Sequence, residues 1–159
     1  MGFAAVALAA RLVVAGAFLV AAVQKLRVRS GLTAELAGFG VPGTLVAPAA
    51  VALPVAELAT AAALVVFPGT AVPAFVAIGL LALFTGAVLA NLAQGRRPPC
   101  PCFGAASAEP LSARTVVRNG WLLGLAVLAT GSITGAEAWA VVLWTAVLGA
   151  ATVVLLMRA

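Results

Sequence analysis

The sequence predicts an all-α integral membrane protein, a helical bundle with four or five membrane-spanning helices. Of the 159 residues, 65% are hydrophobic and only 8% are charged, whereas soluble domains carry roughly 25% charged residues. The mean hydropathy is +1.23, which would leave a soluble fold with far too much apolar surface in water. At ~20 residues for each span, the chain has room for four or five spans and short loops.

Five apolar runs within a single membrane domain (residues 1–159) mark the expected spans. Each should be a helix, because a long segment in lipid must satisfy its own backbone hydrogen bonds. The first run lacks a basic leader and exceeds the apolar length of a signal peptide, so we expect a retained span. In a four-span alternative, the short fourth run is re-entrant or folds beneath the others. The runs cover about 3–26, 47–67, 70–93, 115–130 and 138–157.

The basic residues predict how these spans are oriented. With five spans, eight of the nine Lys and Arg residues fall on one side and none on the other. An excess of this kind marks the cytoplasmic side, so we expect the N-terminus outside and an inner-membrane location. Because these cations flank apolar runs, the net charge of +5 indicates membrane topology rather than nucleic-acid binding. The eight are Lys25, Arg27, Arg29, Arg96, Arg97, Arg114, Arg118 and Arg158.

The only two cysteines lie in a loop expected at 94–114, near the cytoplasmic face. Its prolines and glycines exclude a continuous helix. A disulfide between Cys100 and Cys102 would close a very small ring, and a bend at Pro101 would bring the two residues into bonding range. Such a strained bond is suited to thiol–disulfide exchange, and the neighbouring Arg97 favours the thiolate. We therefore predict a redox-active pair.

Two other roles for the cysteines remain open. Free cysteines are often buried as small apolar residues, which would make the pair structural. Two thiolates could also hold Cu(I), whereas a zinc site needs four ligands and the chain has no His. We predict no metal site. The absence of His also removes His-based acid–base catalysis and His-ligated haem.

Charged and polar side chains inside the spans are candidate functional groups, because burying them in lipid is costly. Arg11 and Lys25 lie on one face of the first span, 14 residues and therefore ~21 Å apart. Glu57, in the second span, could pair with either cation, and it could also take part in proton or quinone chemistry. Asn91 is expected to form an interhelical hydrogen bond, and Arg118 to face the Cys loop.

Several segments resemble the MauE/DoxX group of small redox-associated membrane proteins, in particular its methylamine-utilisation MauE branch. The resemblance covers nearly the whole chain. The C-x-C-F-G motif after N-L-x-x-G-R is its most specific part. The matching segments are Arg11 to Lys25-Leu26, Leu53-Pro-Val-Ala-Glu57-Leu58, Asn91-Leu92 to Gly95-Arg96-Arg97-Pro98, Cys100-Pro-Cys102-Phe-Gly104, Pro110-Leu-Ser112 and Arg118-Asn119.

The resemblance implies a DoxX-like bundle that assists thiol–disulfide exchange or electron delivery while a partner protein matures. In the methylamine system, the family is associated with maturation of methylamine dehydrogenase beside a thioredoxin-like partner. One Cys pair cannot carry electrons across ~30 Å of hydrocarbon, so a quinone or a partner protein would be needed. The alternatives are a non-catalytic membrane scaffold for a maturation partner and a protein that handles Cu(I) or a small solute.

Overall fold

The computed structural model describes residues 3–27, 29–98, 111–131 and 138–157, and the regular structure in these ranges is entirely helical. This confirms the predicted all-α membrane bundle. The helices are α1 (Phe3–Arg27), α2 (Arg29–Gly38), α3 (Gly43–Val66), α4 (Val72–Ala93), α5 (Ala113–Leu128) and α6 (Ala138–Met157).

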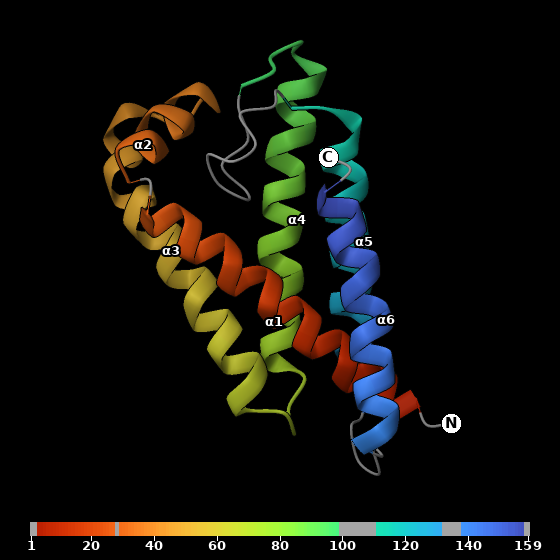
Figure 1. The fold of residues 1–159 in the computed structure, drawn as a ribbon. Coiled ribbons are helices and arrows are strands. Elements are labelled where there is room, and N and C mark those ends of the chain that lie inside the picture. The colour runs from red at the N-terminus through yellow and green to blue at the C-terminus, as the bar shows by residue number, and fades with distance from the viewer. Residues whose placement is uncertain (1–2, 28, 99–110, 132–137, 158–159) are drawn as a thin grey trace.

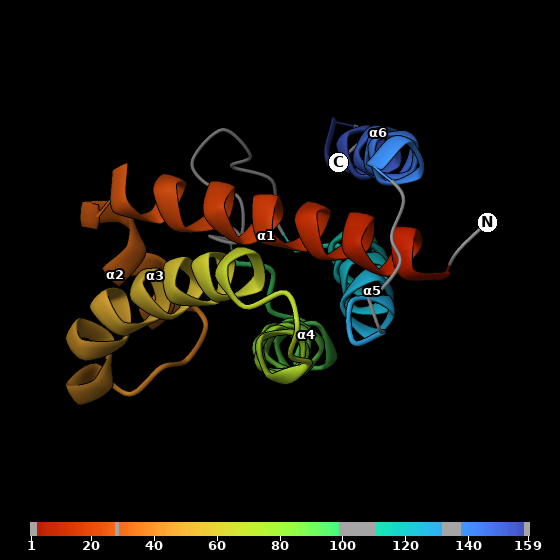
Figure 2. The same ribbon diagram turned by 90° about the horizontal axis from the view of Figure 1, so that it is seen from below.

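Helix α1 is the centre of the bundle. It runs obliquely across the other long helices (Figure 1), with α6 on one side and α3, α4 and α5 on the other (Figure 2). Its small residues allow neighbouring backbones to approach closely, as is usual between membrane helices. The core against which α3, α4, α5 and α6 pack includes Ala9, Ala10, Val14, Ala15 and Phe18 of α1.

Three described helices are long and apolar enough to cross a membrane: α1, α3 and α4. The 16-residue α5 is shorter, and α6 contributes a shorter apolar segment, Ala140–Leu155. Large apolar side chains also cover the outside of the bundle, including Val51, Phe75, Leu83 and Val142. In a bilayer these side chains face hydrocarbon, so their exposure does not oppose folding.

The region between the first two spans contains a helix that the apolar runs did not predict. Helix α2 is short and much less apolar than the spans, and Leu32 and Leu36 are the two buried residues among those of α2 whose burial is described. This i, i+4 pair is enough to pack a surface helix against its neighbours, although it is far too little for a span. Helix α3 also begins at Gly43, four residues before the expected start of the second span at about 47.

Candidate functional site

A buried ion pair joins α1 to α3. Lys25 Nζ donates a hydrogen bond of 2.5 Å to Glu57 Oε1, and both side chains are almost fully buried. Lys25 Nζ also lies 5.5 Å from the centre of the Phe84 ring of α4, within the range of a cation–π contact. Of the two cations that could pair with Glu57, the structure therefore selects Lys25.

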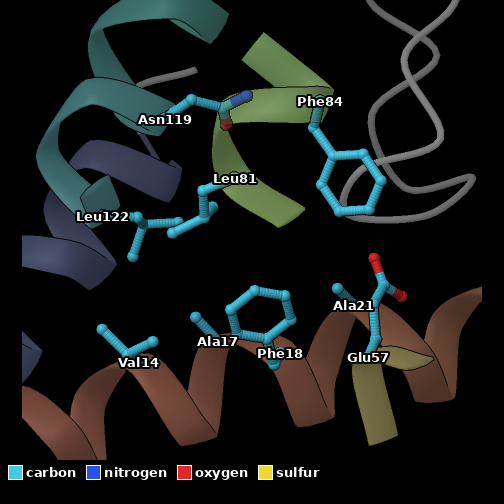
Figure 3. Close-up of a pocket in the computed structure, with 9 residues that line it drawn as sticks. All are labelled: Val14, Ala17, Phe18, Ala21, Glu57, Leu81, Phe84, Asn119 and Leu122. Atoms are coloured by element: carbon cyan, nitrogen blue, oxygen red, sulfur yellow. The ribbon is translucent and has the colours of Figure 1, made fainter. Parts of the chain in front are cut away.

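The ion pair borders a small cavity between α1, α3, α4 and α5. The Glu57 carboxylate and the Asn119 amide both line it, and Phe18 and Phe84 lie on opposite sides of it (Figure 3). Glu57 Oε2 and Asn119 Nδ2 have no hydrogen-bond partner among the described residues, although the two residues are only 1% and 2% exposed. The rest of the lining is apolar: Val14, Ala17, Ala21, Leu81 and Leu122.

Arg11 lies in a separate polar site, nearer the N-terminus of α1 than Lys25. Its guanidinium donates hydrogen bonds to four backbone carbonyl oxygens, at Leu64 (3.0 Å), Phe67 (3.1 Å), Thr70 (2.5 Å) and Ala129 (3.3 Å). These carbonyls lie at or just beyond the C-terminal ends of α3 and α5, where helices have unpaired acceptors and a partial negative charge. Arg11 is thus a structural cap for two helices.

This placement leaves Arg11 out of the ion pair, which was one of the two pairings open for Glu57. Both residues face the protein interior, as expected, at 1% exposure each. They lie at different levels, however, because Glu57 is bonded to Lys25, which is ~21 Å from Arg11 along α1. The sequence placed Arg11 and Lys25 on one face of the helix. It did not reveal that carbonyl oxygens at the ends of two other helices would accept the hydrogen bonds of Arg11.

Asn91 joins the end of α4 to the turn between α2 and α3. Its Nδ2 donates hydrogen bonds to Phe39 O (3.3 Å), in the turn after α2, and to Ala87 O (2.9 Å), in its own helix. Gly40 has a φ of 85°, and a Cβ added there would lie 3.2 Å from Arg96 Nη1. The turn therefore rests directly on the residues that leave α4.

The two described residues that flank the cysteine segment are joined to each other. Leu111 N donates a hydrogen bond of 3.2 Å to Pro98 O. Leu111 is fully buried and packs with Val88 of α4, and Phe39 and Val116 lie against the same cluster. Pro98 and Leu111, which flank residues 99–110 in the sequence, are therefore held together between the end of α4 and the start of α5.

Cys100 and Cys102 lie outside the described residues, so their predicted redox role remains a prediction. Arg97 is exposed just before this segment, and Arg118 is buried in α5 at 7% exposure. The structure thus separates the sequence-predicted residues into three places. Lys25 and Glu57 lie together at the cavity, Arg11 caps helix ends, and Asn91 supports the exit of α4.

Sequence reasoning did not identify Phe84 and Asn119 as parts of the site around Glu57. Asn119 lines the interior cavity. A signal was present: Asn119 follows Arg118 in a short apolar run, and two adjacent polar residues there seldom both face lipid. Phe84 carried no comparable signal, because an aromatic residue in an apolar span is usually ordinary packing.

The apolar bundle with its buried charges defines a multi-pass membrane protein that lies in a lipid bilayer. The sequence model of the family described as methylamine utilisation protein MauE matches residues 3–132. The chain therefore belongs to the MauE family. It is also similar to the methylamine utilization protein MauE of Paracoccus denitrificans, with 39% identity over 127 residues, which cover 77% of this chain and 68% of that relative. No solved structure matches the chain.

Proposed function

We propose that this protein serves methylamine utilisation by assisting thiol–disulfide exchange, or electron delivery, while a partner protein matures. Family membership supports the role in methylamine utilisation. The exchange would take place at Cys100 and Cys102, the only thiols in the chain. A thiolate is the one strong nucleophile available near neutral pH in a protein that has no His.

The observation that carries this proposal is the hydrogen bond between Leu111 N and Pro98 O. It fixes both flanks of the cysteine segment at one end of the bundle, and the buried Leu111 side chain holds that junction in place. A partner protein would then meet the two thiols at a defined place on the membrane surface. The exposed Arg97 lies at the same junction and favours the thiolate form.

The proposal includes a cytoplasmic-side cysteine segment in the inner membrane, on the basis of the eight-to-zero distribution of basic residues. The partner would be a thioredoxin-like protein or another protein that exchanges disulfides. If electrons must cross the membrane, a quinone is the cofactor that the proposal requires, because the bilayer core is ~30 Å thick. Arg11, Lys25, Glu57, Asn91 and Arg118 support the bundle that holds the segment.

The test is a double replacement, Cys100→Ser and Cys102→Ser, in a host that depends on this protein for growth on methylamine. We expect growth to be lost while the amount of protein in the membrane stays unchanged. Ala106→Ser is the matched control, because it introduces the same side chain into the same segment and should leave growth intact. In parallel, alkylation and mass spectrometry at a series of redox potentials should show reversible conversion between dithiol and disulfide.

Full growth of the double variant would reject the exchange function and favour the scaffold, in which the cysteines are structural. A purified protein with one bound copper per chain, lost in the double variant, would instead support Cu(I) handling. Absence of any reversible thiol conversion across the biological range of potentials would also reject the exchange function.

A further inference from the structure

Only one of the two carboxylate oxygens of Glu57 has a hydrogen-bond partner among the described residues. Oε1 accepts the hydrogen bond from Lys25, whereas Oε2 has no partner among the described residues. A buried carboxylate oxygen without a hydrogen bond is unfavourable, so the site is complete only when a donor reaches Oε2. Glu57 lines the cavity, and Figure 3 shows its carboxylate next to the open space below Phe84.

Asn119 offers the complementary group from α5. Its Nδ2 is a donor without a partner among the described residues, and its side chain lines the same cavity. Water can both donate to a carboxylate and accept from an amide. The cavity has room for water.

The charged groups nearest the cavity come from α1, α2 and α5. Lys25 pairs with Glu57, and its positive charge also acts on Glu35 of α2. Arg118, next to Asn119 on α5, is the other buried cation in this part of the bundle. The residues of α4 that line the cavity, Leu81 and Phe84, are apolar. No described group of α4 therefore competes for the proton.

We propose that the cavity holds water between Glu57 and Asn119, and that Glu57 is a proton-exchange site inside the membrane. In the binding step, a hydronium proton moves to Glu57 Oε2. An O–H bond forms, and a neutral water molecule remains. Lys25 then faces a neutral carboxyl group, and proton release restores the ion pair. This inference goes beyond the proposed thiol chemistry and does not depend on it.

The test is infrared difference spectroscopy of the full-length protein in lipid bilayers, between acidic and neutral pH. The chain is well suited to it, because it contains no Asp and only four glutamates: Glu35, Glu57, Glu109 and Glu137. We expect a reversible carbonyl-stretch band from a protonated carboxyl group that shifts in D2O. The band should disappear in Glu57→Gln and persist in the double Cys→Ser protein.

Two further variants test the water without removing the carboxylate. Asn119→Leu removes the amide at similar size, and Ala17→Leu fills the cavity from α1. Both should slow the deuterium shift of the Glu57 band by about tenfold or more, since the cavity water either loses its partner on α5 or is displaced. Thr145→Val is the matched control, because Thr145 also has a buried oxygen without a described partner but lies outside this cavity.

A difference spectrum that loses no carbonyl band in Glu57→Gln would show that Glu57 does not take up the proton and would overturn the inference. Equal deuterium exchange in Asn119→Leu, Ala17→Leu and the parent protein would show that cavity water does not serve Glu57. If Glu57→Gln does not fold, these two variants still decide the question. Failure here leaves the thiol proposal intact, because the Cys-free protein is measured separately.

Discussion

Lys25 Nζ lies 2.5 Å from Glu57 Oε1, and this contact joins the end of α1 to the middle of α3. Nearer the N-terminus of α1, Arg11 binds the carbonyl oxygens of Leu64 and Phe67, at the end of the same α3. The two attachments are ~21 Å apart along α1. Two fixed points define a line, so together they set the oblique angle at which α1 crosses α3 (Figure 1).

Removing one partner of the buried ion pair should lower the free energy of unfolding much more than removing both partners. We expect Glu57→Gln or Lys25→Met to lower the free energy of unfolding by about 3–5 kcal/mol, because a buried charge is left without its partner. The double variant should cost less than the sum of the two single variants. Reversible unfolding in mixed detergent micelles measures all four proteins. Strictly additive losses would show that the two charges are not coupled.

The guanidinium of Arg11 should not be replaceable by an ammonium group. Arg11→Lys keeps the charge but loses the planar fork that reaches four carbonyl oxygens, so we expect a loss of about 2–3 kcal/mol in unfolding free energy. The exposed Arg97 provides the control, since Arg97→Lys should change stability by less than about 0.5 kcal/mol. Equal stability of the two variants would contradict the capping role.

Leu111 should matter both for stability and for the cysteines. Leu111→Ala leaves a cavity where the side chain is fully buried, and we expect a loss of about 2–5 kcal/mol. Because the junction with Pro98 loosens, alkylation of the reduced thiols should become faster. Leu143→Ala on α6, where the side chain is 48% exposed, should change neither quantity appreciably. Unchanged alkylation in Leu111→Ala would show that the junction does not restrain the cysteine segment.

The orientation in the membrane can be tested with single-cysteine probes in the protein that lacks both native cysteines. A probe at Ser30, in α2, should react only with reagents from the cytoplasm. A probe at Gly69 should react only from outside. This turn is exposed, and a Cβ added there meets no atom within 4 Å, so the probe should be tolerated. Labelling of Ser30→Cys from outside would reverse the predicted topology.

Glu35 should make stability depend on pH. Partial burial raises the pKa of the Glu35 carboxyl in the folded protein, and the charge of Lys25 opposes this only in part. An acid with a raised pKa in the folded state contributes its stability at low pH. This contribution is lost as the pH rises through the folded-state pKa. We expect the unfolding free energy of the parent protein to fall with pH relative to Glu35→Gln. A difference in unfolding free energy between the two proteins that stays constant from acidic pH to above the folded-state pKa of Glu35 would contradict the prediction.

The sequence predicted the membrane bundle because composition and long apolar runs determine it directly. It did not predict α2, since Leu32 and Leu36 form a hydrophobic face too small to stand out beside whole apolar spans. It also left open which cation pairs with Glu57. That choice depends on the angle at which α1 crosses α3, which no pattern along a single helix encodes.

The cavity was beyond sequence reasoning for a similar reason. Asn119 reaches it only because α4 and α5 pack side by side with α1 across them (Figure 2). Likewise, the hydrogen bond between Pro98 and Leu111 joins residues on the two sides of a segment whose path the sequence does not define. Residue types thus indicated which side chains were costly to bury, and the tertiary packing decided what each of them would meet.

The capping contacts of Arg11 also have a consequence for biosynthesis. Arg11 enters the membrane with the first helix, but its acceptors at Leu64 and Ala129 are 53 and 118 residues further along the chain. The ribosome must therefore complete α5 before the guanidinium can bind all of its carbonyls. Until then, the insertion machinery or surrounding water has to shelter this charge. Shortened chains that end before α5 should consequently be the ones that membrane proteases remove.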